Sequence, residues 1–143
     1  MMQVSRRQGR VFAMQVLYGI EITGCTPGEA IPAVLASEDF QKPMQAYGMK
    51  LVDLVLEHKS EYLELLKGMS EAWDLERMAL LDRILIMIGL AELGHVVDVP
   101  AKVVLQETVQ IANKYSTEQS GKFVNGILDQ YARDHKMLGE AND

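Results

Sequence analysis

The segment 77–94, RMALLDRILIMIGLAELG, constrains the fold of this chain more than any other part of the sequence. Apolar side chains surround nearly the whole circumference of a helix built from it, and Asp82 and Arg83 are its only mid-helix charges before Glu92. A helix that is apolar on all sides is stable only when other elements cover it. The segment therefore predicts a central buried helix.

Helical periodicity continues through most of the remaining sequence. Glycine and proline interrupt it, as in TGCTPGEA at 23–30, and the only extended segment is HVVDV at 95–99, which cannot form a sheet alone. Helices are expected at about 5–22, 27–35, 43–58, 60–68, 77–94 and 100–115, and a last one carries Phe123 and Tyr131. The prediction is one all-α domain over 1–143 with about seven helices, a first helical half at about 1–75, a second at about 76–135 and a polar tail at 136–143.

Composition excludes several classes of protein. Hydrophobic residues make up 48% and charged residues 24% of the chain, as in ordinary globular domains. No apolar run is long enough to span a bilayer, and Gln15 and Glu21 interrupt the apolar stretch that follows the N-terminal arginines, so no signal peptide is expected. A single cysteine, Cys25, fits a reducing compartment, so a cytoplasmic location is expected.

Charge is distributed unevenly along the chain. The formal net charge is −6, yet residues 1–10 hold three arginines and no acid, while the rest holds 11 of the 14 basic groups and all 20 acids. A basic end on an acidic body can meet a polyanion at one place and another partner elsewhere. A solvated N-terminus explains the same pattern equally well.

Catalytic residues and metal ligands are not expected. The three histidines, His58, His95 and His135, lie far apart in the sequence and lack the spacing of a metal site. Cys25 has no basic neighbour in the sequence that would lower the pKa of its thiol. The sequence therefore predicts a protein without a cofactor that is not an enzyme.

The segment 120–129, SGKFVNGILD, resembles two motifs that it does not match. A phosphate-binding loop needs a glycine at position 116 and a hydroxyl residue at position 123, where this chain has serine and phenylalanine. A hairpin at Asn125-Gly126 conflicts with the helical spacing that runs through it. The segment is therefore predicted to be helical, with Lys122 in the first turn, where free backbone amides favour anions.

The first helix carries a stripe that would suit single-stranded nucleic acid. Arg7, Arg10, Met14 and Tyr18 fall on one face, with Gln15 at its border. Arginine neutralises phosphates and stacks on bases, and an aromatic ring offers a stacking platform. The alternative is a buried Tyr18 beside solvent-facing arginines.

Four blocks carry a resemblance to a known family. They are RRQGRVFAMQVLY at 6–18, LDRILIMIGLAEL at 81–93, DVPAKVVLQETVQIANKY at 98–115 and SGKFVNGILD at 120–129. In this order they resemble the NusB family of bacterial transcription antitermination factors, over residues 6 to about 133. The resemblance implies two packed three-helix subdomains. It also implies binding of single-stranded boxA RNA from ribosomal RNA leader transcripts, jointly with the ribosomal protein NusE, in an RNA polymerase antitermination complex.

The resemblance also implies which residues bind. RNA contacts are expected from Arg6, Arg7, Arg10, Gln15, Tyr18, Tyr115, Gln119, Lys122 and Phe123. Gln119 stands where the family often has an acid, and it could tune RNA affinity. Glu76 and Asp82, expected near the exposed end of the central helix, are the candidate partner-facing residues. With about three phosphate contacts, the logarithm of affinity should fall with the logarithm of salt at a slope of only ~−2.

The same resemblance suggests two other functions. NusB-like domains occur fused to RNA cytosine methyltransferases, but this chain has no methyltransferase segment and no glycine-rich cofactor loop. A helical protein-binding module, or a homodimer that masks its arginines, is the main alternative, because some family members dimerise.

Overall fold

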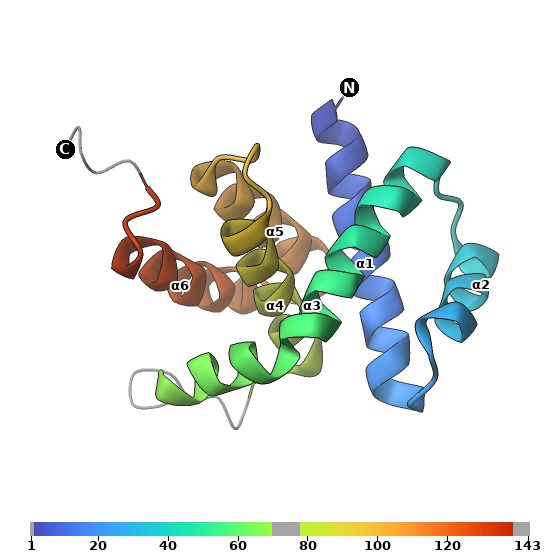
Figure 1. The fold of residues 1–143 in the computed structure, drawn as a ribbon, viewed down its shortest axis with the longest axis horizontal. Coiled ribbons are helices and arrows are strands. Elements are labelled where there is room, and N and C mark those ends of the chain that lie inside the picture. Colours follow the sequence, from blue (N-terminus) through green and yellow to red (C-terminus); the bar gives the residue numbers. More distant parts are fainter. Residues whose placement is uncertain (1, 70–77, 139–143) are drawn as a thin grey trace. The chain divides into compact units, whose positions relative to one another are not determined.

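The computed structural model describes residues 2–69 and 78–138, in which it contains six α-helices and no strand (Figure 1). The helices are α1 (Met2–Thr23), α2 (Pro27–Ser37), α3 (Lys42–Gly68), α4 (Leu80–His95), α5 (Ala101–Tyr115) and α6 (Glu118–Asp134). The all-α class is confirmed. The chain divides into two compact units, Met1–Glu57 and His58–Asp143, which we call unit 1 and unit 2.

The difference between six and about seven helices arises in α3. The sequence predicted separate helices at 43–58 and 60–68, and α3 joins them across a kink at His58, whose backbone is non-helical (φ −107°, ψ 15°). The division between the two units falls at this kink. The border that the sequence suggested, near residue 75, lies outside the described residues.

Unit 1 is built from α1, α2 and the first part of α3. Along α1, Phe12, Val16 and Leu17 are buried, and the ring of Phe12 packs edge-on against Phe40 with centroids 5.1 Å apart. α1 contacts α2, and it approaches α3 closely at glycine. A Cβ at Gly48 would lie only 2.7 Å from the carbonyl oxygen of Gly9, so the two helices can approach this closely only without side chains there.

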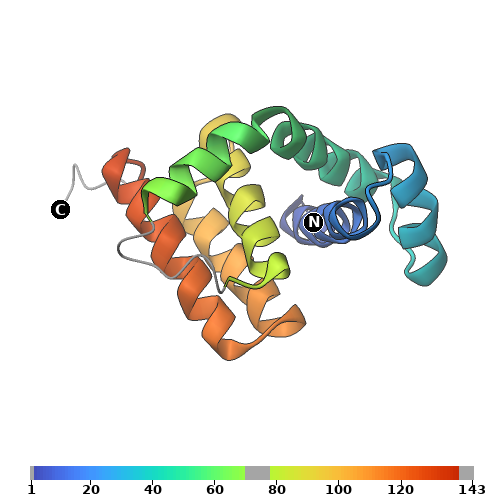
Figure 2. The same ribbon diagram turned by 90° about the horizontal axis from the view of Figure 1, so that it is seen from below.

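Unit 2 holds the second part of α3 together with α4, α5 and α6. Helices α4, α5 and α6 contact one another in all three pairs, and they lie side by side in the view of Figure 2. Every residue of α4 from Ile84 to Glu92 is buried. The prediction of a central buried helix is therefore confirmed.

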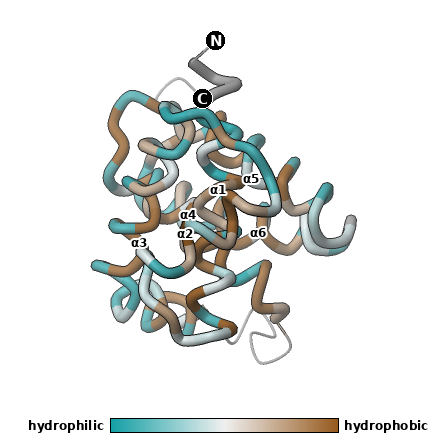
Figure 3. The backbone as a smooth tube through the Cα atoms, turned by 90° about the vertical axis from the view of Figure 1, so that its right-hand side faces the viewer, coloured by the Kyte–Doolittle hydropathy of each residue, from teal (hydrophilic) through white to brown (hydrophobic). Residues whose placement is uncertain are grey.

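Most helices are amphipathic. Hydrophilic and hydrophobic stretches alternate along the backbone (Figure 3), as expected when each helix turns one face to a core and another to solvent. No helix in the described part of the chain has both the length and the apolar character needed to cross a bilayer.

Candidate nucleic-acid interface

The three arginines of α1 occupy different environments. Arg7 is exposed, and Arg6 is half-buried with its guanidinium carbon 5.0 Å from the centre of the Tyr47 ring. This cation–π contact links the start of α1 to α3. Arg10 is only 1% exposed, so the expectation that it faces solvent beside Arg7 is wrong.

The other residues of the predicted α1 stripe also differ in their exposure to solvent. Met14 is buried, whereas Tyr18 is 44% exposed. Gln15 is half-buried, and its side-chain amide donates a hydrogen bond of 3.1 Å to Oε1 of Glu38, the residue that ends α2. The exposed positions of the stripe are therefore Arg7 and Tyr18, separated by buried residues.

The start of α6 is set by an N-cap. Thr117 has an extended backbone (φ −128°, ψ 167°), and its side-chain oxygen accepts a hydrogen bond of 3.1 Å from the backbone amide of Ser120. Threonine is favoured at this position because it pairs one of the free amides of the first turn. The helix begins at Glu118, so the prediction that Lys122 lies in the first turn is wrong, and Lys122 lies in the second turn.

A hydroxyl cluster joins this N-terminus to α4. The Ser120 hydroxyl donates to Oδ2 of Asp82 at 2.9 Å, and it lies 2.9 Å from the Ser116 hydroxyl and 3.0 Å from that of Thr117. Asp82 is 6% exposed, so the expectation that it lies at the surface is wrong. The other candidate, Glu76, lies outside the described residues.

The α5–α6 hairpin brings the remaining predicted site residues together. Lys122 and Gln119 are exposed, while Phe123 and Tyr115 are half-buried. α5 and α6 lie close together at Gly121, where an added Cβ would overlap the side chain of Asn113.

The cations and rings of this hairpin suit nucleic acid. Lys114 contributes a second cation, with Nζ 5.4 Å from the centre of the Tyr115 ring. Cations beside aromatic rings can neutralise phosphates and stack on bases.

The arginines of α1 lie in unit 1, and the α5–α6 hairpin lies in unit 2.

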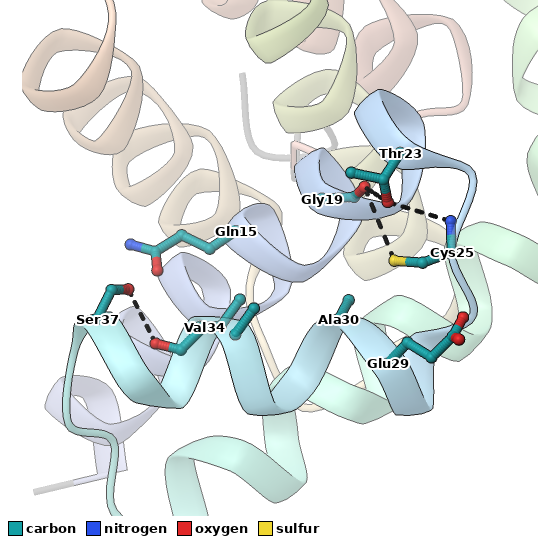
Figure 4. A pocket seen from close by; sticks show the side chains of 9 residues that line it. Gln15, Gly19, Thr23, Cys25, Glu29, Ala30, Val34 and Ser37 are labelled. Atoms are coloured by element: carbon teal, nitrogen blue, oxygen red, sulfur yellow. Dashed lines mark hydrogen bonds between the residues drawn. The ribbon is translucent and has the colours of Figure 1, made fainter.

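Unit 1 also contains a groove of about 440 Å³ between α1 and α2 (Figure 4). It is lined by Gln15, Gly19, Thr23, Cys25, Glu29, Ala30, Ala33, Val34 and Ser37. Within the described residues, no group of three or more potential ligands could hold a metal ion.

Sequence reasoning missed the partners that hold the candidate site residues in place. Tyr47 pairs with Arg6, Glu38 with Gln15, and Ser120 with Asp82. The Thr117 cap had a local signal, a threonine directly before a helical run. The three pairings join residues far apart in the sequence, so no local pattern could have revealed them.

The fold and these side chains define an all-helical protein made of two units, each with cationic side chains exposed to solvent. The family model described as NusB family matches residues 7–133, and the chain belongs to this family.

Individual relatives agree with this assignment. The chain is 36% identical over 140 residues to the transcription antitermination protein NusB of Chloroherpeton thalassium, covering 96% of this chain and 66% of that protein. It is 37% identical over 128 residues to the protein of the same name from Kineococcus radiotolerans, covering 90% and 93%. A crystal structure of the antitermination factors NusB and NusE in complex with dsRNA contains a chain with a similar fold, at a TM-score of 0.82 and 29% identity, covering 94% of this chain and 99% of that one.

Proposed function

We propose that this protein is a transcription antitermination factor that binds boxA RNA of ribosomal RNA leader transcripts together with the ribosomal protein NusE. In this role it helps RNA polymerase resist termination and catalyses no reaction. Membership of the NusB family supports the proposal. So does the similar solved structure, which holds NusE and dsRNA.

The observation that carries the proposal is the α5–α6 hairpin. Its exposed Lys122 stands next to Phe123 on α6, and Tyr115 closes α5. Lysine supplies a charge for a phosphate, and the two rings supply surfaces for unpaired bases. The N-cap and the Asp82–Ser120 hydrogen bond fix the start of α6, which holds the lysine in position before RNA arrives.

The start of α1, in unit 1, provides a second set of proposed RNA contacts. Arg7 is exposed and Arg6 is half-buried against Tyr47, so both are assigned phosphate contacts together with Lys122. Arg10, at 1% exposure, is assigned a structural role. Three phosphate contacts give a salt slope of ~−2 for single-stranded RNA. So weak an electrostatic contribution makes joint binding with a protein partner advantageous.

Fluorescence anisotropy with labelled boxA-like and scrambled RNA tests the proposal, with and without NusE and at two salt concentrations. Arg7→Ala and Lys122→Ala should each weaken boxA binding and reduce the magnitude of the salt slope by about 0.7. Lys102→Ala is the matched control, because Lys102 is exposed at the opposite end of α5 from Tyr115. Circular dichroism establishes that each variant keeps its helices.

Two results would contradict the proposal. One is unchanged boxA affinity in both variants, which would remove the assigned surface. The other is equal binding to both RNAs that does not depend on NusE, which would leave only nonspecific attraction. Light scattering on the same samples tests the alternative of a homodimer that masks its arginines. A dimer that boxA RNA does not alter would favour that alternative over the proposal.

A further inference from the structure

The groove between α1 and α2 has no part in the proposed RNA contacts apart from Gln15 at its edge. Its walls come from the C-terminal half of α1, the connecting turn and α2, all within unit 1 (Figure 4). Small residues create the space. Gly19 faces Ala30, since a Cβ on Gly19 would lie at an ordinary contact distance of 3.8 Å from the Cβ of Ala30, and Ala33 is exposed along the groove.

Apolar surface extends beyond the groove onto α1. Ile22 is 59% exposed, and it lies three residues after the groove-lining Gly19, so the two are neighbours on the surface of α1. A large aliphatic side chain this exposed, beside a cavity floored by buried Ala30 and Val34, marks a surface suited to binding an apolar side chain.

The segment 11–41, which holds every residue that lines the groove, carries charges of a single sign. Residues 11–41 contain no lysine or arginine and four acids, namely Glu21, Glu29, Glu38 and Asp39. This is the opposite of the start of α1, so phosphates would be repelled here. The region therefore favours a positively charged partner.

Two of the four carboxylates are held in place. Glu29 accepts a hydrogen bond of 2.9 Å from the backbone amide of Thr26 in the capping box that begins α2. Glu38, at the other end of α2, accepts the hydrogen bond from Gln15. Nine helical rises separate them, so the two acids lie about 14 Å apart along the helix axis. Glu29 lines the groove, and Glu38 is hydrogen-bonded to the lining residue Gln15, so the two acids form a fixed pattern that a partner can match.

We propose that this groove is a docking surface for a basic segment of a partner protein, whose apolar side chain enters between α1 and α2 while its cations meet Glu29 and Glu38. The inference goes beyond the proposed RNA binding and does not depend on it. Apolar burial supplies the affinity, and the two acids select partners by charge.

Two helical peptides of the same length test this inference against the full chain labelled with ¹⁵N. One carries leucines on one face and lysines elsewhere, and the other replaces every lysine with glutamate. In NMR titrations the lysine peptide should shift the amides of Gly19, Ala33 and Ser37, and the glutamate peptide should not.

Variants locate the binding site. Ala33→Lys, which places a charged chain in the groove, should weaken binding of the lysine peptide roughly tenfold, as expected when one apolar side chain can no longer be buried. Ala36→Lys is the matched control, because Ala36 is exposed on the same helix but does not line the groove. Glu29→Gln preserves the capping box and removes one charge, so it should weaken binding by about two- to fivefold.

Several outcomes would overturn the inference. Equal binding of both peptides would mean that the protein does not select partners by charge. Equal effects of Ala33→Lys and Ala36→Lys would mean that the peptide does not bind in the groove. Groove shifts caused by single-stranded RNA instead of the peptide would make it a nucleic-acid site. Groove shifts that depend on protein concentration alone would make the occupant a second copy of this chain.

Discussion

Replacing Gly48 with alanine should destabilise the protein, although alanine is the better helix former. The added methyl group would lie 2.7 Å from the carbonyl oxygen of Gly9 and 2.7 Å from Cδ2 of Phe12. Favourable contacts between carbon atoms require about 3.5–4.0 Å, so the overlap approaches 1 Å. Phe12 is fully buried and the oxygen belongs to the backbone of α1, so neither can move without displacing that helix.

The expected loss of stability is the difference between the cost of overpacking and the gain in helix propensity. Overpacking of this kind costs about 1–3 kcal/mol. The higher helix propensity of alanine offsets about 1 kcal/mol of that cost. The free energy of unfolding of Gly48→Ala should therefore be lower than that of the original protein by up to about 2 kcal/mol. Urea unfolding followed by circular dichroism measures this difference. The comparison is valid when the free energy of unfolding falls with urea concentration at the same slope in both proteins.

Gly19→Ala is the matched control for this prediction. It makes the same chemical change within a helix, yet its methyl group would meet only Ala30 at 3.8 Å, an ordinary contact. This variant should gain about 0.5–1 kcal/mol. If Gly48→Ala proved as stable as Gly19→Ala, the close approach of α1 and α3 would not constrain the fold.

Three further predictions concern unit 2. Ser120→Ala removes the hydrogen bond to the buried Asp82 carboxylate, so urea unfolding should show a loss of about 1–3 kcal/mol. Thr117→Ala removes the α6 cap, so thermal unfolding should show a loss of about 1 kcal/mol. Burial and, secondarily, the nearby Glu61 carboxylate raise the pKa of Tyr131 above its ordinary value of 10.0. The contribution of this pKa shift to the free energy of unfolding is fully present below pH 10 and is lost as pH rises through the pKa of the folded state. Tyr131→Phe should therefore make the alkaline loss of stability less steep. Unchanged stability in either alanine variant, or an unchanged alkaline decline in the phenylalanine variant, would contradict the respective reasoning.

The sequence by itself determined the helices and the class of fold. The segment around α4 is apolar on every side, and Ile84 to Glu92 are buried as this pattern required. Such predictions succeed because the spacing of apolar residues along a helix is a local property. The kink in α3 had a local signal as well, since two separate helices were expected to meet at its position, His58.

Only the tertiary structure decided which of the candidate side chains are accessible. Arg10 and Arg7 share a face in the sequence pattern, yet Arg10 is 1% exposed and Arg7 is exposed. Asp82 was expected at the surface, but it is buried against Ser120, a residue 38 positions away. Helical spacing specifies which side chains point the same way, whereas burial depends on which distant segment packs against them. That packing is a property of the whole chain, so no local pattern contains it.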